Sequence, residues 1–284
     1  MDENTNTAAQ SAATPLTLVL GASGKTGRRV AERLEAAGVN VRRGSRTAGP
    51  AFDWEDPATW PDALADVTNV YVSFYPDLAV PGAPEAIAAF VAQAEQAGVR
   101  RLVLLSGRGE AEAARAEQAV AESGLEWAVV RASWFAQNFS EGAFADAVRS
   151  GEVALPVGEV GEPFVDADDI ADVAVAALTK EGHHGQIYEV TGPRLLTFAE
   201  AVATIAAAAD RDIAFVPIPL AAFTGYLAEA GEPQEVIDML AYLFAEVLDG
   251  RNAYLADGVH RALGREPRDF ADYARTAAEN GDWK

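Results

Sequence analysis

The sequence predicts an α/β fold in which a doubly wound parallel sheet is joined to a smaller, mostly helical C-terminal lobe. Short runs rich in Val and Leu alternate with longer stretches of helical periodicity through the first half of the chain. These runs lack polar alternation, which is typical of strands that helices cover on both faces. After about residue 150 the pattern changes to short strands among many helices.

The expected elements follow one another in a regular order. In the first half, strands are predicted at residues 17–21, 39–43, 69–74, 101–106 and 126–131, with helices at 25–37, 57–65, 83–97 and 110–123. In the second half, strands are predicted at 152–155, 187–190 and 213–216, with helices at 167–179, 197–209, 219–230, 233–248 and 268–278. No polar linker divides the halves, so the second half is expected to pack on the carboxyl edge of the sheet.

Composition and charge exclude several classes of protein. The 284 residues are 50% hydrophobic and include no cysteine, which indicates a globular protein without disulfides or cysteine metal sites. The opening residues lack the features of a secretory signal, and no run of about 18 apolar residues occurs, so we expect a cytoplasmic protein that does not enter a membrane. A net charge of −21 without a basic patch argues against nucleic acid as a partner.

A glycine-rich turn follows the first predicted strand. Gly21, Gly24 and Gly27 form G-x-x-G-x-x-G between that strand and a predicted helix. In this context backbone N–H groups and the helix dipole face a pyrophosphate, and the glycines permit its close approach, as in a Rossmann-type domain. Gly27 is expected to let the helix lie close to the strand. The alternative is a tight turn with a purely structural role.

The end of the second predicted strand favours NADP(H) over NAD(H). An acidic residue would bind the ribose 2′-hydroxyl of NAD there, but no Asp or Glu occurs from Gly38 to Phe52. Arg42, Arg43 and Arg46, together with a nearby serine at position 45, offer positive charge and a hydroxyl to a 2′-phosphate. The alternative, that these arginines form a solvated strand end, is stronger for the first two than for Arg46.

These observations divide the chain into three predicted parts. Residues 1–14 are expected to be a disordered tail, and 15–150 an NADP-binding Rossmann domain. Residues 151–284 are expected to form mainly a substrate-binding lobe, with some elements that return to the sheet.

Several motifs together resemble one known family. They are GASGKTG at 21–27, FDWEDPATW at 52–60, GVRRLVLLS at 98–106, VVRASWFAQNFSEG at 129–142, FVDADDIADVAV at 164–175, YEVTGP at 188–193 and LGREPRDFADYA at 263–274. The chain resembles, from about residue 16 to 276, the NmrA-like branch of atypical short-chain dehydrogenases/reductases, particularly bacterial agroclavine dehydrogenase-like proteins. That branch includes NAD(P)H quinone reductases, a triphenylmethane-dye reductase and redox-sensing regulators.

The resemblance implies a set of contacts. Cofactor contacts are implied at Gly21, Ser23, Gly24, Lys25, Thr26, Gly27 and Arg46, and at Ser73, Phe74 and Tyr75 at the end of the family's fourth strand. Ser106, with Ser133, Trp134 and Phe135 after the family's sixth strand, is implied to line a nicotinamide pocket. Asp53 and Trp54 follow a short extended segment and are expected beside the adenine, although Trp54 has an equally good structural interpretation. The chain departs from many relatives at Ala132, where proline is common.

The chain also lacks the usual acid catalyst of short-chain dehydrogenases. That catalyst is a Tyr four residues before a Lys, whose charge lowers the pKa of the phenol. The only lysines are Lys25, Lys180 and Lys284, and none has a Tyr four positions earlier. A ketone would therefore leave alkoxide charge without a donor, which favours an acceptor such as an iminium or a quinone.

Aromatic residues are expected to enclose a flat hydrophobic ligand. Trp134 and Phe135 follow a strand end, where open α/β sheets bind ligands, and Phe223 and Tyr226 lie on predicted C-terminal helices. Asn138 is expected to orient a ligand, or else to satisfy local backbone. No metal site is expected: the GHHG segment at 182–185 is typical of a surface turn, and the acidic run at 166–169 is typical of a helix N-terminus.

The sequence therefore predicts an NADPH-dependent reductase that transfers hydride to a conjugated small molecule of iminium, quinone or enone type, with a role in secondary metabolism. Tyr75 or Ser106 is the candidate hydrogen-bond donor to the acceptor. Two alternatives stay open: a redox sensor that binds NADP without turnover, and a lyase or isomerase on the same fold. The expected partner is a small hydrophobic substrate, and the expected assembly is a monomer or homodimer.

Overall fold

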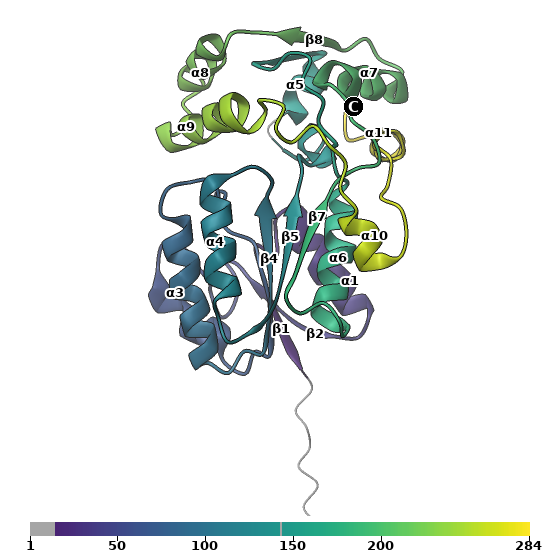
Figure 1. Ribbon diagram of the computed structural model, residues 1–284. Coiled ribbons are helices and arrows are strands. Elements are labelled where there is room, and N and C mark those ends of the chain that lie inside the picture. Colours follow the sequence, from purple (N-terminus) through teal and green to yellow (C-terminus); the bar gives the residue numbers. More distant parts are fainter. Residues whose placement is uncertain (1–14, 143) are drawn as a thin grey trace, which may run out of the picture.

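The computed structural model describes residues 15–142 and 144–284, so the tail predicted at 1–14 lies outside the described residues. Its main feature is a six-stranded parallel sheet in the order β2-β1-β3-β4-β5-β7 (Figure 1). The strands are β1 (Leu16–Leu20), β2 (Asn40–Gly44), β3 (Asn69–Val72), β4 (Arg101–Gly107), β5 (Glu126–Ala132) and β7 (Gln186–Val190).

Helices cover both faces of this sheet. One face is covered by α3 (Ala83–Gln96) and α4 (Ala111–Ala121), and the other by α1 (Lys25–Ala36) and α6 (Ala167–Thr179) (Figure 1). Neighbouring residues of β1 enter opposite cores: Leu18 packs with the α3 side and Val19 with the α1 side, and both are fully buried. This two-sided burial is why the strand sequences show no polar alternation, and it confirms the predicted doubly wound fold.

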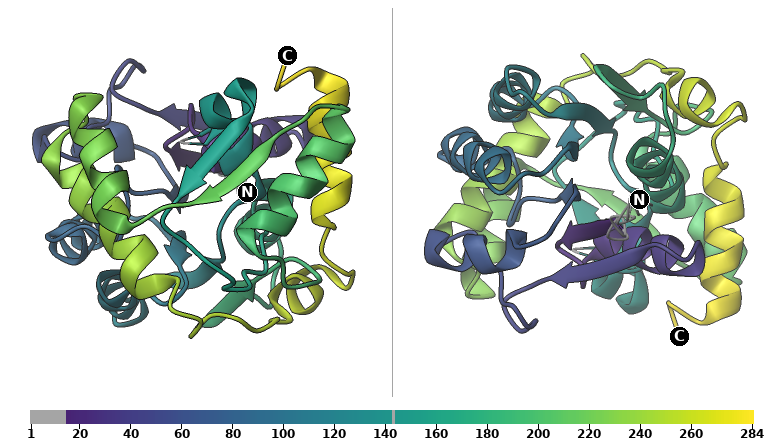
Figure 2. Two further views of the ribbon diagram at one scale, coloured as in Figure 1. Left: turned by 90° about the horizontal axis from the view of Figure 1, so that it is seen from above. Right: turned by 90° about the horizontal axis from the view of Figure 1, so that it is seen from below.

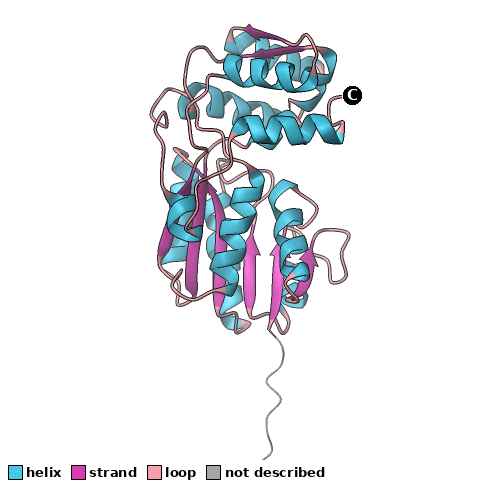
Figure 3. Ribbon diagram, turned by 90° about the vertical axis from the view of Figure 1, so that its right-hand side faces the viewer, coloured by secondary structure: helices cyan, strands magenta, loops and turns pink. Residues whose placement is uncertain are grey.

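A second, mostly helical assembly lies beyond the carboxyl ends of the strands (Figures 1 and 3). It contains a parallel pair, β6 (Glu152–Leu155) and β8 (Ala214–Pro217), which forms a separate two-stranded sheet. Around it lie α5 (Ala145–Ser150), α7 (Phe198–Ala209), α8 (Leu220–Glu229), α9 (Gln234–Tyr242) and α11 (Phe270–Asn280). Seen from above, α8 and α9 lie on one side of this pair, and α7 and α11 lie together on the other (Figure 2).

Aromatic packing holds the second assembly together. Phe139 and Phe198 are fully buried in its core, with ring centroids 6.1 Å apart. The indole N–H of the buried Trp283 donates to the carbonyl of Phe139 at 2.7 Å, so the end of the chain is tied to the segment after β5.

Most predicted elements are present, and the differences concern short or irregular segments. The helix predicted at 57–65 begins as a 3₁₀ turn (Pro57–Thr59) before α2 (Trp60–Leu64), and the one predicted at 233–248 is α9 followed by a π-helical turn (Leu243–Val247). Two helices of six residues, α5 and α10 (Gly258–Leu263), were not expected, because so few residues carry too little periodicity.

The acidic run at 166–169 begins a helix, as predicted. Asp166 is the N-cap of α6, and its side chain accepts from the N–H of Asp168 at 2.8 Å. Asp169 is fully buried and forms ion pairs with Arg265, at 2.7 Å, and Arg268, which connects α6 to the segment before α11. In the part of the chain that the structure describes, no helix is long and apolar enough to cross a membrane.

Candidate active site

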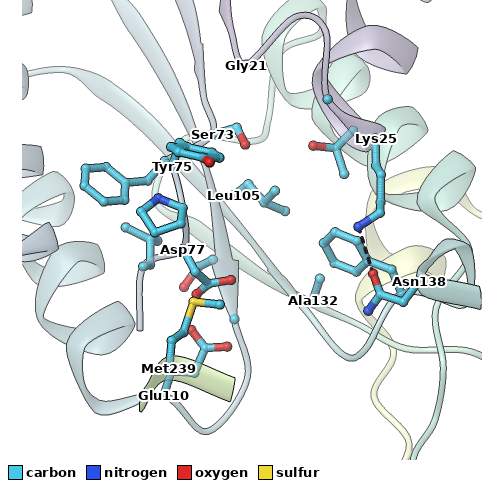
Figure 4. A pocket seen from close by; sticks show the side chains of 18 of the residues that line it. Gly21, Lys25, Ser73, Tyr75, Asp77, Leu105, Glu110, Ala132, Asn138 and Met239 are labelled. Carbon is cyan, nitrogen blue, oxygen red and sulfur yellow. Dashed lines mark hydrogen bonds between the residues drawn. The ribbon is translucent and has the colours of Figure 1, made fainter. Parts of the chain in front are cut away.

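A cavity of about 730 Å³ opens at the carboxyl ends of β1, β3, β4 and β5. The glycine turn after β1 forms one end of its wall, and Met239 and Leu240 of α9 contribute from the second assembly. Figure 4 shows Gly21 and Lys25 on one part of this wall and Asp77, Glu110 and Met239 on another. The cavity therefore joins the turn after β1 to the second assembly.

Two glycines of the turn, Gly21 and Gly27, are required by close packing. Gly21 has φ +65°, and a Cβ there would lie 3.2 Å from the Cβ of Ser73. A Cβ on Gly27 would lie 2.2 Å from the carbonyl oxygen of Gly21, so the helix packs directly on the turn, as predicted. Gly27 does not line the cavity; it shapes the turn from behind.

The first turn of α1 fits a phosphate. Its N-cap is Gly24, and no side chain caps the helix there. Gly24, Lys25 and Thr26 line the cavity, and the N–H groups of this first turn have no side-chain cap, an arrangement that suits a bound pyrophosphate. The residues of this chain thus fit the dinucleotide that the glycine pattern predicts.

Most residues predicted to contact a cofactor do line the cavity. These are Gly21, Ser23, Gly24, Lys25, Thr26, Arg46, Asp53, Ser73, Phe74 and Ser133.

Two residues that line the cavity form a hydrogen bond with each other. The Nζ of Lys25 donates to the side-chain oxygen of Asn138 at 3.0 Å (Figure 4). Burial lowers the pKa of the Lys25 ammonium below its ordinary value, and the carboxylates of Glu141 and Asp77 oppose this effect. Asn138 is thus held by a cation of the glycine turn and lines the cavity.

The three arginines at the end of β2 differ in their interaction partners. A guanidinium N–H of Arg42 donates to the carbonyls of Ala63 at 2.8 Å and Ala65 at 2.6 Å. Arg43 forms two hydrogen bonds with the carboxylate of Glu35, at 2.9 and 2.8 Å. These two side chains therefore have structural partners.

Arg46 alone of the three lines the cavity. Its guanidinium lies 5.7 Å from the centroid of the Tyr75 ring, and the side chain is exposed. Ser45 lines the cavity beside it. The charge available to a phosphate at this end of the cavity is therefore that of Arg46.

Asp53 and Trp54 also line the cavity, and Trp54 has a structural role as well. The Trp54 ring packs 4.8 Å from that of Phe74, and its indole N–H donates to the carbonyl of Ser73 at 3.3 Å. Ser73 and Phe74 follow β3, the third strand of the structure rather than the fourth, because the extended segment before Asp53 pairs with no strand. For the same reason Ser133 and Trp134 follow the fifth strand rather than the sixth.

The two candidate hydrogen-bond donors are poorly placed. Ser106 lines the cavity but is 4% exposed, and its hydroxyl donates to the Oε1 of Glu117 at 2.6 Å. Glu117 is in turn held by Arg131, whose Nε donates to the same oxygen at 2.9 Å. Tyr75 lines the cavity with a side chain that is 69% exposed. The Ser106 hydroxyl therefore already donates its hydrogen bond to Glu117, and the Tyr75 side chain is open to water.

Two of the predicted substrate residues do not line the cavity. Trp134 and Phe135 do line it, but Phe223 is buried against Phe244 with ring centroids 5.2 Å apart. Tyr226 is 68% exposed and lies outside the cavity lining. The sequence could not separate these roles, because α8 presents aromatic side chains to both the core and the solvent.

Besides Glu55 and Glu141, three carboxyl groups of the wall that were not expected from the sequence lie nearer the second assembly or the strand ends. Asp77 follows β3, Glu110 is the N-cap of α4, and Glu162 lies between β6 and α6; all three line the cavity. Glu162 is 2% exposed, and one of its oxygens accepts from the N–H of Trp134 at 3.1 Å. Burial raises the pKa of Glu162 to about 7, against the effect of this N–H and of the Arg108 charge.

Comparison with known proteins agrees with this geometry. The family described as NAD(P)H-binding matches residues 21–181. The NAD(P)H azoreductase of Xenophilus azovorans is 34% identical over 285 residues, an alignment that covers 92% of this chain and 97% of the azoreductase. The chain belongs to the NAD(P)H-binding family.

Two further similarities match the resemblance expected from the sequence. The agroclavine dehydrogenase of Claviceps fusiformis is 32% identical, with 90% of this chain and 95% of that protein covered. The crystal structure of the Citrobacter sp. triphenylmethane reductase complexed with NADP(H) has a TM-score of 0.73 at 18% identity, covering 93% of this chain and 99% of that one. The expected similarity to agroclavine dehydrogenase is confirmed, and so is the expectation of an NAD(P)H-dependent oxidoreductase.

Proposed function

We propose that this protein is an NADPH-dependent reductase that transfers hydride to a conjugated small-molecule acceptor of iminium, quinone or enone type. The observation that carries the proposal is one continuous cavity, which runs from the glycine turn to aromatic and apolar side chains of the second assembly. NADPH bound at the turn would supply the hydride. The relatives support a conjugated acceptor, since one is named an azoreductase and another a triphenylmethane reductase.

Residues of the turn would hold the cofactor. The N–H groups at the start of α1 and the Lys25 ammonium would bind the pyrophosphate, since both offer positive charge at the glycine turn. Arg46 would pair with the 2′-phosphate, because Arg42 and Arg43 have other partners. Asp53 and Trp54 would border the adenine.

The other residues would bind and shield the acceptor. Trp134, Phe135 and Leu243 offer apolar surface to a flat conjugated molecule and exclude water from it. Asn138, fixed by Lys25, would orient a polar group of the ligand by hydrogen bonding. A substrate of this kind also suits a role in secondary metabolism.

Titration calorimetry with NADPH and NADH tests the cofactor assignment. The wild type is expected to bind NADPH more tightly, and Arg46→Ala is expected to lose about 10- to 100-fold in NADPH affinity, the effect of one charge-assisted hydrogen bond or ion pair. Arg43→Ala is the matched control, because its guanidinium is held by Glu35. Equal affinity of the wild type for the two cofactors, or an unchanged preference in Arg46→Ala, would contradict the assignment.

A further inference from the structure

A neutral acceptor needs a proton as well as a hydride, and neither Ser106 nor Tyr75 offers a sheltered donor. The cavity wall contains another candidate, the carboxyl groups of Asp77 and Glu110. They come from the loops after β3 and β4, two neighbouring strands, and lie close together beside Met239 (Figure 4). Ligands of open α/β sheets bind at this edge, so the pair lies where an acceptor is expected.

The charge of Asp77 raises the pKa of the Glu110 carboxyl group, so the two groups influence each other's protonation. Two carboxyl groups that share a site in this way are accommodated best when one of them carries a proton. The Oε2 of Glu110 is buried and has no partner among the described residues, and a shared proton would satisfy it. Asp77 is fixed on its other side, where its Oδ1 accepts from the N–H of Ala79 at 2.9 Å.

The surrounding charges indicate which group holds the proton. Burial raises the pKa of both carboxyl groups. The Lys25 ammonium lowers the pKa of Asp77, whereas the charges of Asp77 and Glu117 raise that of Glu110 further. Glu110 is therefore the protonated member of the pair, and Asp77 is the ionised one.

The wall also contains a third buried carboxyl group, that of Glu162. Glu162 is 2% exposed and lines the same cavity, and only one of its oxygens has a hydrogen-bond partner in the described chain. Among residues 15–142 and 144–284, no group of three or more His, Asp or Glu side chains is arranged to hold a metal ion. A ligand that exchanges hydrogen bonds and a proton with the wall fits these groups.

We propose that Glu110, paired with Asp77, donates the proton that completes the reduction of a neutral acceptor. The acceptor takes a hydride at one atom of its double bond, and the electron pair of that bond moves toward the conjugated N or O. That atom takes the proton from the Glu110 carboxyl, whose O–H bond breaks. Glu110 is left ionised beside Asp77 and regains a proton from solvent. The overall reaction consumes one NADPH and one proton.

This inference rests on the proposed function, and its first test does not require turnover. Infrared difference spectra of the protein without cofactor, at about pH 8, would detect the carbonyl stretch of a protonated carboxyl group. At that pH Glu162, with a pKa of about 7, is mostly ionised. The wild type is expected to have the band and Glu110→Gln to lack it, while Glu162→Gln keeps it.

The second test is turnover of a neutral quinone compared with a preformed iminium. Glu110→Gln is expected to slow quinone reduction about 10²- to 10⁴-fold and to leave iminium reduction near the wild-type rate, since the iminium carbon needs no proton. Asp77→Asn is expected to move the alkaline fall in the quinone rate to lower pH, because the Asp77 charge is one cause of the raised pKa of Glu110.

Two further variants distinguish loss of the proton donor from misfolding. Gly107→Ala would place a Cβ 2.0 Å from the Oε1 of Glu110, so it is expected to displace that carboxyl group and to lose the quinone rate while every acid remains. Glu232→Gln, on the exposed segment after α8, is the matched control and is expected to change neither rate.

Quinone turnover by a folded Glu110→Gln at the wild-type rate would overturn the donor, and so would a wild-type spectrum without the protonated band. If the wild type consumes no NADPH with any acceptor, the proposed function fails, and the donor role fails with it even where the band is present.

Discussion

Gly27→Ala tests whether the glycine turn is packed as tightly as the structure indicates. The added Cβ would lie 2.2 Å from the carbonyl oxygen and 2.6 Å from the carbonyl carbon of Gly21, where ordinary contact begins at about 3.4 Å. Both atoms are backbone, and Gly21 is held at φ +65° against Ser73, so the clash cannot be relieved by a side-chain rotation. Strand β1 and helix α1 would have to move apart.

The cost can be worked out from typical magnitudes. Overpacking costs about 1–3 kcal/mol and sometimes more, and a backbone clash lies at the upper end of this range. Alanine in a helix recovers about 1 kcal/mol relative to glycine, which leaves a net loss of roughly 2 kcal/mol. For a large domain, each kcal/mol lowers Tm by about 2–4 °C, so Tm should fall by roughly 4–8 °C.

Thermal unfolding followed by circular dichroism measures this change, and Gly24→Val provides the comparison. Gly24 has φ −82° and ψ 176°, which any residue adopts, and its Cβ would lie 3.3 Å from the carbonyl oxygen of Gly21. We expect Gly24→Val to stay folded, with a loss of about 1 kcal/mol at the N-cap, but to lose NADPH binding. If Gly27→Ala melts at the wild-type temperature, the packing argument is wrong; if Gly24→Val binds NADPH normally, the turn has only a structural role.

Two further predictions concern stability. The raised pKa of Glu162, about 7 when folded against about 4.5 when unfolded, means that the folded state binds the proton more tightly. The bound proton therefore stabilises the folded state fully below about pH 4.5, and this contribution is lost as the pH rises through 7. Glu162→Gln should remove this change in the free energy of unfolding, which amounts to roughly 3 kcal/mol at most. Denaturation at a series of pH values measures it, and an equal slope in both proteins would refute it. Phe223→Ala should lower the free energy of unfolding by about 3 kcal/mol, because the ring is buried against Phe244. It should leave NADPH affinity unchanged, and weaker NADPH binding by the folded variant would show that Phe223 contributes to the site.

The sheet could be predicted because its physical signal is local. The inner strands β1 and β3 are buried on both faces, so their residues are mostly apolar, and Leu18 and Val19 show this for β1. The glycine turn is also local, since the contact of Gly27 with Gly21 joins residues six apart. The helices α5 and α10 were missed because six residues carry too little periodicity.

The site was only partly predictable, because its decisive contacts are remote in sequence. The choice among three arginines depended on Glu35 and on the carbonyls of Ala63 and Ala65, which engage Arg43 and Arg42. Asp77, Glu110 and Glu162 come from three separate loops, and no spacing in the sequence joins them. Their one local signal is position, since Asp77 and Glu110 each follow a buried strand shortly after its carboxyl end.

The central claim is hydride transfer from NADPH to a conjugated acceptor, and transfer of label tests it most directly. NADPH deuterated at the transferring position of the nicotinamide would be incubated with the protein and an enone, whose β-carbon keeps the label because it does not exchange with water. We predict one deuterium at that carbon for each NADPH consumed. An unlabelled product formed while NADPH is consumed, or no consumption of NADPH with the enone, would contradict the account.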